Sequence, residues 1–239
     1  MQISEENLEY LNGSKFSNGL NFPISKKENV PSLRMDFIEK LVYKKSVLHV
    51  GCIDHVPLIE NKISKNQWLH KRIMKSSKKC LGIDINEEGI NFVKNLGYEN
   101  ILNLDLINDD VPEEIHKDLW DYFILGEVLE HIDNPVEFLS AIQTKYKGIV
   151  ERIVITVPNA LKYSNFKKAM QHTEYINSDH RYWFTPYTLA KIVTLSNMLP
   201  INNFYFVQGH AFDKNKLFHK LMLNMFPALR DIIIMVANI

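Results

Sequence analysis

Acidic and imidazole side chains cluster in the stretch Asp121–Pro135, which reads DYFILGEVLEHIDNP. Glu127, Glu130 and His131 stand at positions i, i+3 and i+4, so a helical backbone would project all three from one face. Carboxylates and imidazoles are side chains that exchange protons with substrates and bind ligands. The alternative is structural: acids near a helix N-terminus complement the helix dipole, and His131 then packs locally.

The first half of the same stretch predicts the element that positions these groups. Tyr122–Leu125 is a short continuous apolar run, which is typical of a strand buried on both faces of a parallel sheet. Gly126 permits close backbone approach at the carboxyl end of that strand, where open α/β sheets bind their ligands. A helix is expected to follow, from Val128 to about Tyr146.

Strand and helix patterns alternate along most of the chain. Four more short apolar runs predict strands, and helical or loop segments separate them. These runs are Ser46–Gly51, Lys79–Asp84, Asn100–Leu106 and Arg152–Val157. Two final strands are expected at Ile201–Gln208 and Asp231–Ile239, and a helix that opens at Pro31 leads into the first strand. The alternation predicts an α/β fold with a doubly wound, Rossmann-like sheet.

The composition is that of an ordinary globular protein. The 239 residues are 46% hydrophobic and 23% charged, with a formal net charge of zero. One domain is expected, and the charge balance gives no electrostatic support for a nucleic-acid or anionic-membrane surface. The N-terminal stretch lacks the features of a signal peptide and no apolar run reaches transmembrane length, so we expect a cytoplasmic protein without a membrane span. Cys52 and Cys80 are expected to be reduced, packed thiols.

Two segments fall outside the regular alternation. Residues 1–34 are mostly polar with little periodicity, so we expect an N-terminal arm or a flap over the site. Residues 160–184 form a long segment that ends in SDHRYWF, and a loop of this size in a compact domain is more often functional than not. Thr185 and Pro186 then provide an N-cap and a first-turn proline for a helix.

The order of several short motifs resembles that of the class I S-adenosylmethionine-dependent methyltransferases. VLHVGC at Val47–Cys52, GID at Gly82–Asp84 and NLD at Asn103–Asp105 resemble the motifs that end the first three strands. GEVLEHIDNP, and then VPN followed by DHRYWFTPYTL, resemble later motifs of the family. The resemblance implies a seven-stranded sheet, mostly parallel with the last strand antiparallel, over residues 35–239 with insertions at about 56–78 and 160–184.

The resemblance places the cofactor, S-adenosylmethionine, at the tips of the strands. The expected cofactor-binding residues are Gly51, Asp54, Asp84, Ile85, Asp105, Leu106, Gly126 and Glu127. Gly51 would let the backbone approach the methionine part, Asp84 would bind the ribose hydroxyls, and Asp105 would meet the adenine amino group. From the residues alone, Asp84 could instead cap the following helix, and Asp105 could cap its own loop.

Three positions depart from the family pattern. Ile53 and His55 stand where the family usually has glycines, and His49 stands where it usually has an acid. These changes affect the methionine end of the expected pocket, where Asp54 would contact the amino group instead. They leave open a second function, a non-catalytic cofactor-binding or scaffold protein with the same fold.

The EVLEH element and the downstream DH resemble two branches of the family, the ubiquinone-pathway O-methyltransferases and the small-RNA 2′-O-methyltransferases. In both branches this constellation is associated with a divalent metal near the acceptor hydroxyl. The matching positions here are Glu127, Glu130, His131 and His180, with Mg²⁺, Mn²⁺ or Zn²⁺ as the metal. His131 and His180 are the expected catalytic residues.

The sequence thus predicts an S-adenosylmethionine-dependent methyltransferase that acts on an oxygen of a small molecule or a glycan precursor. An RNA 2′-O-methyltransferase is an alternative, which the neutral net charge disfavours. A nicotinamide-dependent oxidoreductase is disfavoured because G-x-G-x-x-G does not follow Val50. The sequence gives no indication of the oligomeric state.

Overall fold

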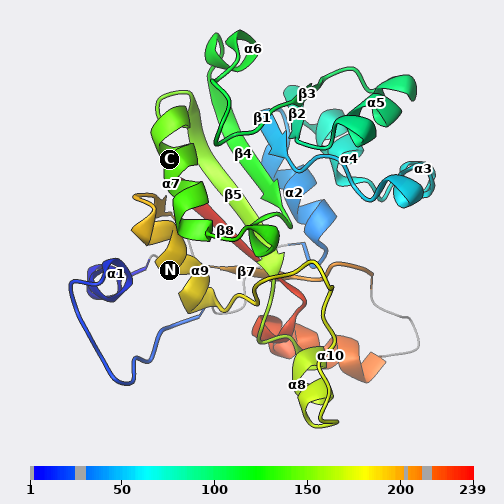
Figure 1. Cartoon of the computed structure of the whole chain (residues 1–239). Helices are drawn as coiled ribbons and strands as arrows, with labels where there is room; N and C mark the ends of the chain where they lie inside the picture. The colour runs from blue at the N-terminus through cyan, green and yellow to red at the C-terminus, as the bar shows by residue number, and fades with distance from the viewer. Residues whose placement is uncertain (1–2, 25–30, 202–203, 212–216) are drawn as a thin grey trace.

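The computed structural model describes residues 3–24, 31–201, 204–211 and 217–239, and a mixed sheet runs through its centre (Figure 1). The strands are β1 (Ser46–Val50), β2 (Lys79–Asp84), β3 (Ile101–Asn103), β4 (Trp120–Gly126), β5 (Val150–Pro158), β6 (Leu199–Pro200), β7 (Tyr205–Val207) and β8 (Ile232–Asn238). Their order is β3-β2-β1-β4-β5-β8-β6, with β7 also paired to β8. Strands β1 to β5 are parallel, whereas β8 is antiparallel to its neighbours. The predicted fold class is confirmed.

The strands β6 and β7 follow one another along the same edge of β8. Leu199 of β6 pairs with Asn238, and Tyr205 of β7 pairs with Ile234, while β5 occupies the opposite edge of β8. In the part of the chain that the structure describes, the sheet therefore has seven strand positions. The strand predicted at Ile201–Gln208 contains β7, whereas β6 ends just before it, and residues 202–203 lie outside the described ranges.

Helices cover both faces of this sheet. They are α1 (Glu5–Asn12), α2 (Arg34–Val42), α3 (Val56–Ser64), α4 (Leu69–Ser76), α5 (Glu87–Asn95), α6 (Glu113–His116), α7 (Pro135–Tyr146), α8 (Tyr163–Ala169), α9 (Pro186–Leu195) and α10 (Leu217–Met225), with short 3₁₀ helices η1 (Leu129–His131) and η2 (Pro227–Leu229). Helices α7 and α9 pack on one face of the sheet and α2 and α4 on the other (Figure 1).

The central strand β4 is buried on both faces, which explains its uninterrupted apolar sequence. Phe123 and Leu125 pack in the core on the α7 side, while Tyr122 and Ile124 pack on the side of α2 and α4. Successive side chains of a strand alternate between the two faces, so both sets must be apolar. Burial of each aliphatic or aromatic side chain contributes roughly 1.5–3 kcal/mol, which holds the carboxyl end of β4 in place.

The long helix predicted from Val128 to Tyr146 is wrong in its first part. The chain instead forms the 3₁₀ helix η1, and α7 begins only at Pro135. The Asn134 side chain caps α7 by accepting a hydrogen bond from the Glu137 N–H at 3.3 Å. In addition, the ring of Pro135 disfavours a helical conformation of the residue before it, which is Asn134. Glu127 has a φ of 63° and precedes η1, so the predicted helical face does not exist there.

The helix predicted to open at Pro31 begins at Arg34 instead. Leu33 is extended and forms a bridge with Gln208, just after β7. The Arg34 N–H donates to the Gln208 carbonyl at 2.9 Å, and the Gln208 N–H donates to the Ser32 carbonyl at 2.7 Å. The residues before α2 therefore use their backbone groups to extend the edge of the sheet, which the local sequence pattern does not show.

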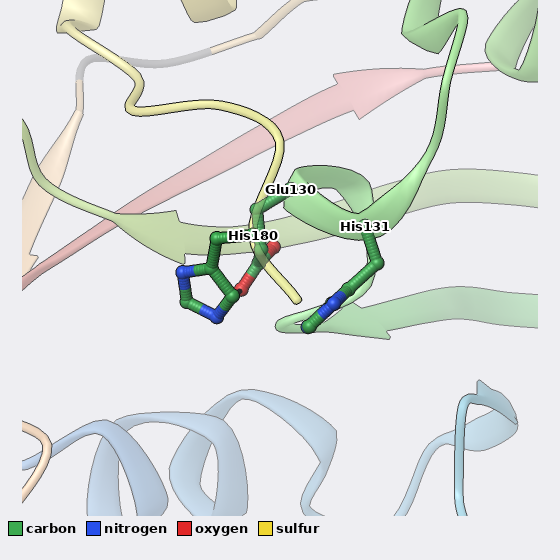
Figure 2. A group of neighbouring side chains, drawn as sticks. All are labelled: Glu130, His131 and His180. Atoms are coloured by element: carbon green, nitrogen blue, oxygen red, sulfur yellow. Dashed lines mark ion pairs between the residues drawn. The ribbon is translucent and has the colours of Figure 1, made fainter. Parts of the chain in front are cut away.

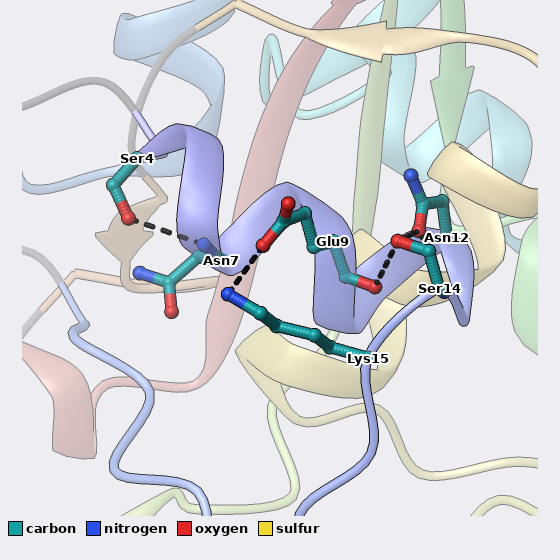
Figure 3. A network of polar contacts seen from close by, with 6 residues as sticks. All are labelled: Ser4, Asn7, Glu9, Asn12, Ser14 and Lys15. Carbon is teal, nitrogen blue, oxygen red and sulfur yellow. Dashed lines mark hydrogen bonds and ion pairs between the residues drawn. The ribbon is translucent and has the colours of Figure 1, made fainter.

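The N-terminal segment contains a helix that packs on the body of the protein. Ser4 caps α1 by accepting a hydrogen bond from the Asn7 N–H at 3.2 Å, and Lys15 pairs with Glu9 at 2.6 Å (Figure 3). Leu11 of α1 is fully buried in the same core cluster as α9 residues. This helix lies beside α9.

The two predicted insertions contain regular structure. Residues 56–78 hold α3 and α4, and residues 160–184 hold α8. Thr185 caps α9 through a capping box with Thr188, and Pro186 occupies the first turn, as predicted. Cys52 and Cys80 are free and buried. Among the described residues, no helix combines the length and the apolar character needed to cross a bilayer.

Candidate active site

Two cavities lie side by side at the carboxyl ends of β1, β2 and β4. The first has a volume of about 340 Å³ and is lined by Gly51, Asp84, Ile85, Asp105 and Leu106 among others. The second has a volume of about 420 Å³, and its lining includes Gly51, His49, Asp54, Gly126, Glu127 and His180. Since Gly51 lines both, the turn after β1 separates them. Most residues predicted to bind a cofactor are thus brought to one edge of the sheet.

Gly51 forms a turn that no larger residue could make unchanged. Its φ is 64°, and a Cβ atom at this position would lie 2.6 Å from Cγ2 of Val128. Its N–H donates to the Ile83 carbonyl at 2.9 Å, which ties the turn to β2. The backbone here can therefore approach a ligand closely.

Asp84, at the end of β2, fastens the turn that follows β1. Its Oδ2 accepts a hydrogen bond from the Ile53 N–H at 2.8 Å, and its Oδ1 accepts one from the Asn86 N–H at 3.0 Å. Partial burial raises the pKa of this carboxyl group, while these N–H groups act in the opposite direction. The alternative role as a helix N-cap is wrong, because Asn86 caps α5 by accepting from the Gly89 N–H at 3.0 Å.

Asp105 uses both carboxylate oxygens within its own loop. Oδ1 accepts from the N–H groups of Ile107 at 2.9 Å and Asn108 at 3.1 Å, and Oδ2 accepts from the Asn108 side chain at 2.8 Å. The Asn108 side chain and these N–H groups lower the pKa of this carboxyl group. The loop-capping alternative therefore describes its contacts, although Asp105 and the buried Leu106 also line the first cavity.

Asp54 is engaged in an ion pair at the edge of the second cavity. Its Oδ2 lies 2.6 Å from Nζ of Lys62 in α3, and its Oδ1 accepts from the His55 N–H at 2.8 Å. Gly126 lies opposite, where a Cβ atom would come within 3.1 Å of Cδ2 of Leu69. The cavity is therefore narrow at the end of β4 and polar at its α3 side.

Three of the four predicted metal ligands, Glu130, His131 and His180, lie together (Figure 2). Glu130 and His131 come from the 3₁₀ helix η1 instead of the predicted α-helix, and His180 comes from the 160–184 segment. One potential ligand atom of each lies within 4.8 Å of the others. Nε2 of His180 is 4.0 Å from Oε1 of Glu130, and the two imidazole rings are perpendicular with centroids 4.8 Å apart. The three side chains extend to the same side of the chain (Figure 2).

The environment of this cluster suits a cation. Glu130 is fully buried, and within the described residues neither of its carboxylate oxygens has a hydrogen-bond partner. Burial, and then the nearby Glu127, raise the pKa of Glu130 to about 8. Nδ1 of His131 lies 3.2 Å from the Asp179 carbonyl, so Nδ1 carries the proton and Nε2 keeps a lone pair, as metal-binding histidines do. Burial, and then His131, lower the pKa of His180, so its ring is neutral.

Glu127 lies outside this three-residue group. Its Oε1 faces Nη1 of Arg34 at 3.5 Å, across the second cavity. Arg34 stands at the start of α2, and the sequence analysis did not single it out because no motif surrounds it. Its side chain is only 16% exposed, and two of its nitrogens, Nε and Nη1, have no hydrogen-bond partner in the described part of the chain.

The sequence analysis also missed a pair of histidines below the second cavity. His49 was noted only as a departure from a motif, and His70 was part of an insertion without a predicted role. Their Nδ1 atoms lie 3.1 Å apart in the structure, and both residues are buried. Two histidines in separate segments give no sequence signal of a contact.

Comparison with known proteins bears on the fold. No protein-family model and no curated protein matches this chain. Among solved structures, the small RNA methyltransferase HEN1 superposes with a TM-score of 0.56 at 13% identity, over 93% of this chain and 27% of that one. The fold of this chain is therefore the class I methyltransferase fold. A putative S-adenosylmethionine-dependent methyltransferase from Listeria monocytogenes matches with a TM-score of 0.50 at 12% identity, over 84% of this chain and 94% of that one.

A third match carries a bound product of the cofactor. Magnesium protoporphyrin IX methyltransferase from Synechocystis, solved with S-adenosylhomocysteine, has a TM-score of 0.50 at 14% identity, over 85% of this chain and 82% of that one. The present chain spans about a quarter of the length of HEN1 and most of the length of the other two. At these identities, the matches establish the class I methyltransferase fold.

Proposed function

We propose that this protein is an S-adenosylmethionine-dependent methyltransferase that methylates an oxygen of a small molecule or a glycan precursor. The observation that carries the proposal is a set of buried polar atoms that converge on the second cavity without hydrogen-bond partners in the described residues. Those of the cavity lining belong to Arg34, His49, Glu127 and His180, and the Glu130 carboxylate lies next to them, with Oε1 4.0 Å from Nε2 of His180. Leaving such groups unpaired costs free energy, so they indicate a polar ligand at this edge of the sheet.

The two neighbouring cavities suit the two halves of the cofactor. The first is largely apolar, with Leu104, Leu106 and Phe138 in its wall, and it suits the adenosine part. In this arrangement, Asp84 and Ile85 would contact the ribose, and Asp105 would contact the adenine. In the second cavity, Gly51, Asp54, Gly126 and Glu127 surround the place of the methionine part.

A divalent metal fits the acceptor side of the second cavity. Glu130, His131 and His180 would hold it, with Glu127 nearby, because the buried Glu130 carboxylate lacks a partner among the described residues and His131 presents the tautomer of a metal ligand. A bound divalent ion would lower the pKa of an acceptor hydroxyl.

The chain's own residues orient the acceptor and accept its proton. Where no metal occupies its lone pair, the neutral His180 can receive the hydroxyl proton at that ring nitrogen while the acceptor oxygen bonds to the methyl carbon. The bond between that carbon and the sulfonium sulfur breaks, and S-adenosylhomocysteine leaves. Glu130 is fully buried, so bulk water does not reach its carboxyl group.

Calorimetry and crystallography test this proposal. Titration with S-adenosylmethionine and with S-adenosylhomocysteine should each release or absorb heat, and a crystal soaked with S-adenosylhomocysteine and Mn²⁺ should show the nucleoside in the first cavity. An anomalous peak between Glu130 and His180 is expected in the same crystal. Absence of heat with both ligands would contradict the proposed function, whereas nucleoside without a manganese peak would remove only the metal.

Two other functions have specific support. Ile53 and His55 in place of glycines favour a non-catalytic cofactor-binding or scaffold protein, and cofactor binding without methyl transfer to a broad panel of acceptors would establish it. The likeness to a small RNA methyltransferase favours an RNA 2′-O-methyltransferase. Strongly salt-dependent RNA binding would support that alternative, against a net charge of zero.

A further inference from the structure

His49 and His70 face each other below the second cavity. His49 lies in β1 and His70 in α4, with their Nδ1 atoms 3.1 Å apart and their rings stacked at a centroid distance of 5.3 Å. They are 2% and 0% exposed, and neither Nε2 atom has a hydrogen-bond partner in the described ranges. His49 lines the cavity, and its Nε2 is 3.7 Å from the place where a Cβ on Gly126 would stand. Its free nitrogen therefore lies at the cavity wall.

The short contact between the two Nδ1 atoms fixes the tautomers of the pair. Burial lowers the pKa of His70 to about 4 and that of His49 well below its ordinary value, so both rings are neutral near pH 7. A neutral imidazole has one N–H and one lone pair. Two lone pairs, or two N–H groups, would repel at this distance, so one histidine donates from Nδ1 and the other accepts. The donor keeps an acceptor lone pair on Nε2.

A neighbouring thiol indicates which histidine is the donor. Sγ of Cys80 lies 3.9 Å from Nδ1 of His70. Burial raises the pKa of this thiol to about 12, so it is a protonated, weak hydrogen-bond donor. As a donor, the thiol shares the lone pair on Nδ1 of His70 that accepts from His49. In this arrangement His49 is the donor, and Nε2 of His49, a residue of the cavity lining, is an acceptor.

We infer that Nε2 of His49 accepts a hydrogen bond from the ammonium group at the methionine end of the cofactor, and that His70 is a positioning residue that holds His49 in the required tautomer. This inference rests on the proposed function. A neutral imidazole thus takes the place of the acid that the family pattern has at this position. Asp54 is less suited to that contact because it is paired with Lys62 at 2.6 Å.

The 56–78 insertion supplies the partner of His49. Trp68, just before α4, is buried and donates from Nε1 to the Cys52 carbonyl at 2.9 Å, so it holds α4 against the cofactor turn. Gly82 in β2 provides room for His70, because a Cβ atom there would come within 2.8 Å of Cε1 of its ring. The insertion therefore positions His70, two residues after Trp68.

Calorimetry with two ligands tests the role of His49. S-adenosylhomocysteine carries the amino-acid part, and 5′-methylthioadenosine lacks it. His49→Leu should weaken S-adenosylhomocysteine binding at least about tenfold and leave methylthioadenosine binding unchanged, as expected for a lost hydrogen bond to a charged group. His49→Gln, which keeps an acceptor near the Nε2 position, should stay within about threefold of wild type, and so should the exposed control His116→Leu. Equal losses for both ligands, or no loss, would overturn the inference.

Nitrogen NMR of the wild-type protein tests the tautomer without a substitution. With ¹⁵N-labelled histidine, Nε2 of His49 should give a pyridine-type signal that shifts on addition of S-adenosylhomocysteine and not of methylthioadenosine. A proton on Nε2 of His49 would contradict the inference while leaving the proposed function intact. If wild type binds neither nucleoside, both fail together.

Discussion

At the residue scale, burial decides the chemistry of Glu130. Burial of its carboxyl group, and then the nearby Glu127, raise its pKa to about 8 from an ordinary 4.5. The unfolded chain loses this proton near its ordinary pKa, whereas the folded protein keeps it until the higher value. In the metal-free protein, the stability contribution is therefore complete at low pH and is lost as the pH rises from about 4.5 towards 8.

Replacing Glu130 by glutamine should remove this pH dependence. Glutamine is neutral and similar in shape, so the free energy of unfolding of Glu130→Gln should fall less between about pH 5 and pH 8 than that of wild type, by on the order of a few kcal/mol. Urea denaturation in the presence of a chelator measures it. The exposed Glu114→Gln serves as the control. If the free energy of unfolding changes equally with pH in all three proteins, Glu130 is not desolvated as described.

Gly51 combines a positive φ with a close neighbour, and Gly97 separates the two effects. Gly97 also has a positive φ of 91°, but no atom lies within 4 Å of a Cβ placed there. Gly51→Ala should cost about 1–3 kcal/mol of stability and abolish cofactor binding, whereas Gly97→Ala should cost no more than about 1–2 kcal/mol. Thermal unfolding and nucleoside calorimetry measure both effects.

A second substitution checks the cause assigned to Gly51. Val128→Ala removes the methyl group that stands 2.6 Å from the added Cβ. Combined with Gly51→Ala, it should restore part of the lost stability, so the two changes should be less than additive. Full additivity would mean that the close approach to Val128 does not matter.

At the element scale, the interruption between η1 and α7 places Glu130 and His131. A continuous helix would have given these two side chains different directions. Instead, α7 begins at Pro135 with Asn134 as its N-cap, and η1 is a separate turn before it. The 160–184 segment then reaches over η1: the Arg181 N–H donates to the Glu130 carbonyl at 2.8 Å, and the Tyr182 hydroxyl donates to the Asp133 carbonyl at 2.7 Å. These contacts place His180 next to Glu130.

The cap of α7 should therefore influence the site as well as stability. Asn134→Ala removes the side chain that accepts from the Glu137 N–H and should cost about 1 kcal/mol. Because η1 precedes it directly, metal or acceptor binding should weaken in parallel, which Mn²⁺ titration would detect. The matched control is Ser4→Ala, which removes the cap of α1, a helix that packs beside α9. Equal Mn²⁺ affinity in both variants would show that the cap of α7 does not influence metal binding.

At the scale of the whole molecule, the first helix belongs to the folded body. Leu11 is fully buried, and Nζ of Lys191 in α9 donates to the Tyr10 carbonyl at 2.8 Å. Leu11→Ala should thus lower the free energy of unfolding by about 2–5 kcal/mol, whereas Phe16→Ala, at a side chain 84% exposed, should change it by less than about 0.5 kcal/mol. Urea denaturation followed by circular dichroism measures both. Equal stability of the two variants would mean that residues 3–16 form a loose arm.

The positions of the parallel strands along the chain, and the residues that follow each strand, could be predicted from the sequence. Apolar runs such as Tyr122–Leu125 must be covered on both faces, and parallel strands bring their carboxyl ends to one edge, so Gly51, Asp84 and Gly126 were predictable at the same edge of the sheet. These signals are local, because each depends on residues close together in the chain. The pair Asn134-Pro135 also indicates the start of a helix at Pro135, but the apolar pattern from Val128 to Tyr146 favoured one longer helix.

Only the tertiary structure decided which side chains meet. Three such contacts join different segments of the chain: His49 with His70, Arg34 with Glu127, and His131 with Asp179. The local sequence of one segment does not indicate its partner in the other. Their contacts follow from how helices and loops dock on the sheet, which depends on the sum of many weak packing terms. Burial, and with it the pKa of Glu130 and the tautomer of His49, arises only after that docking.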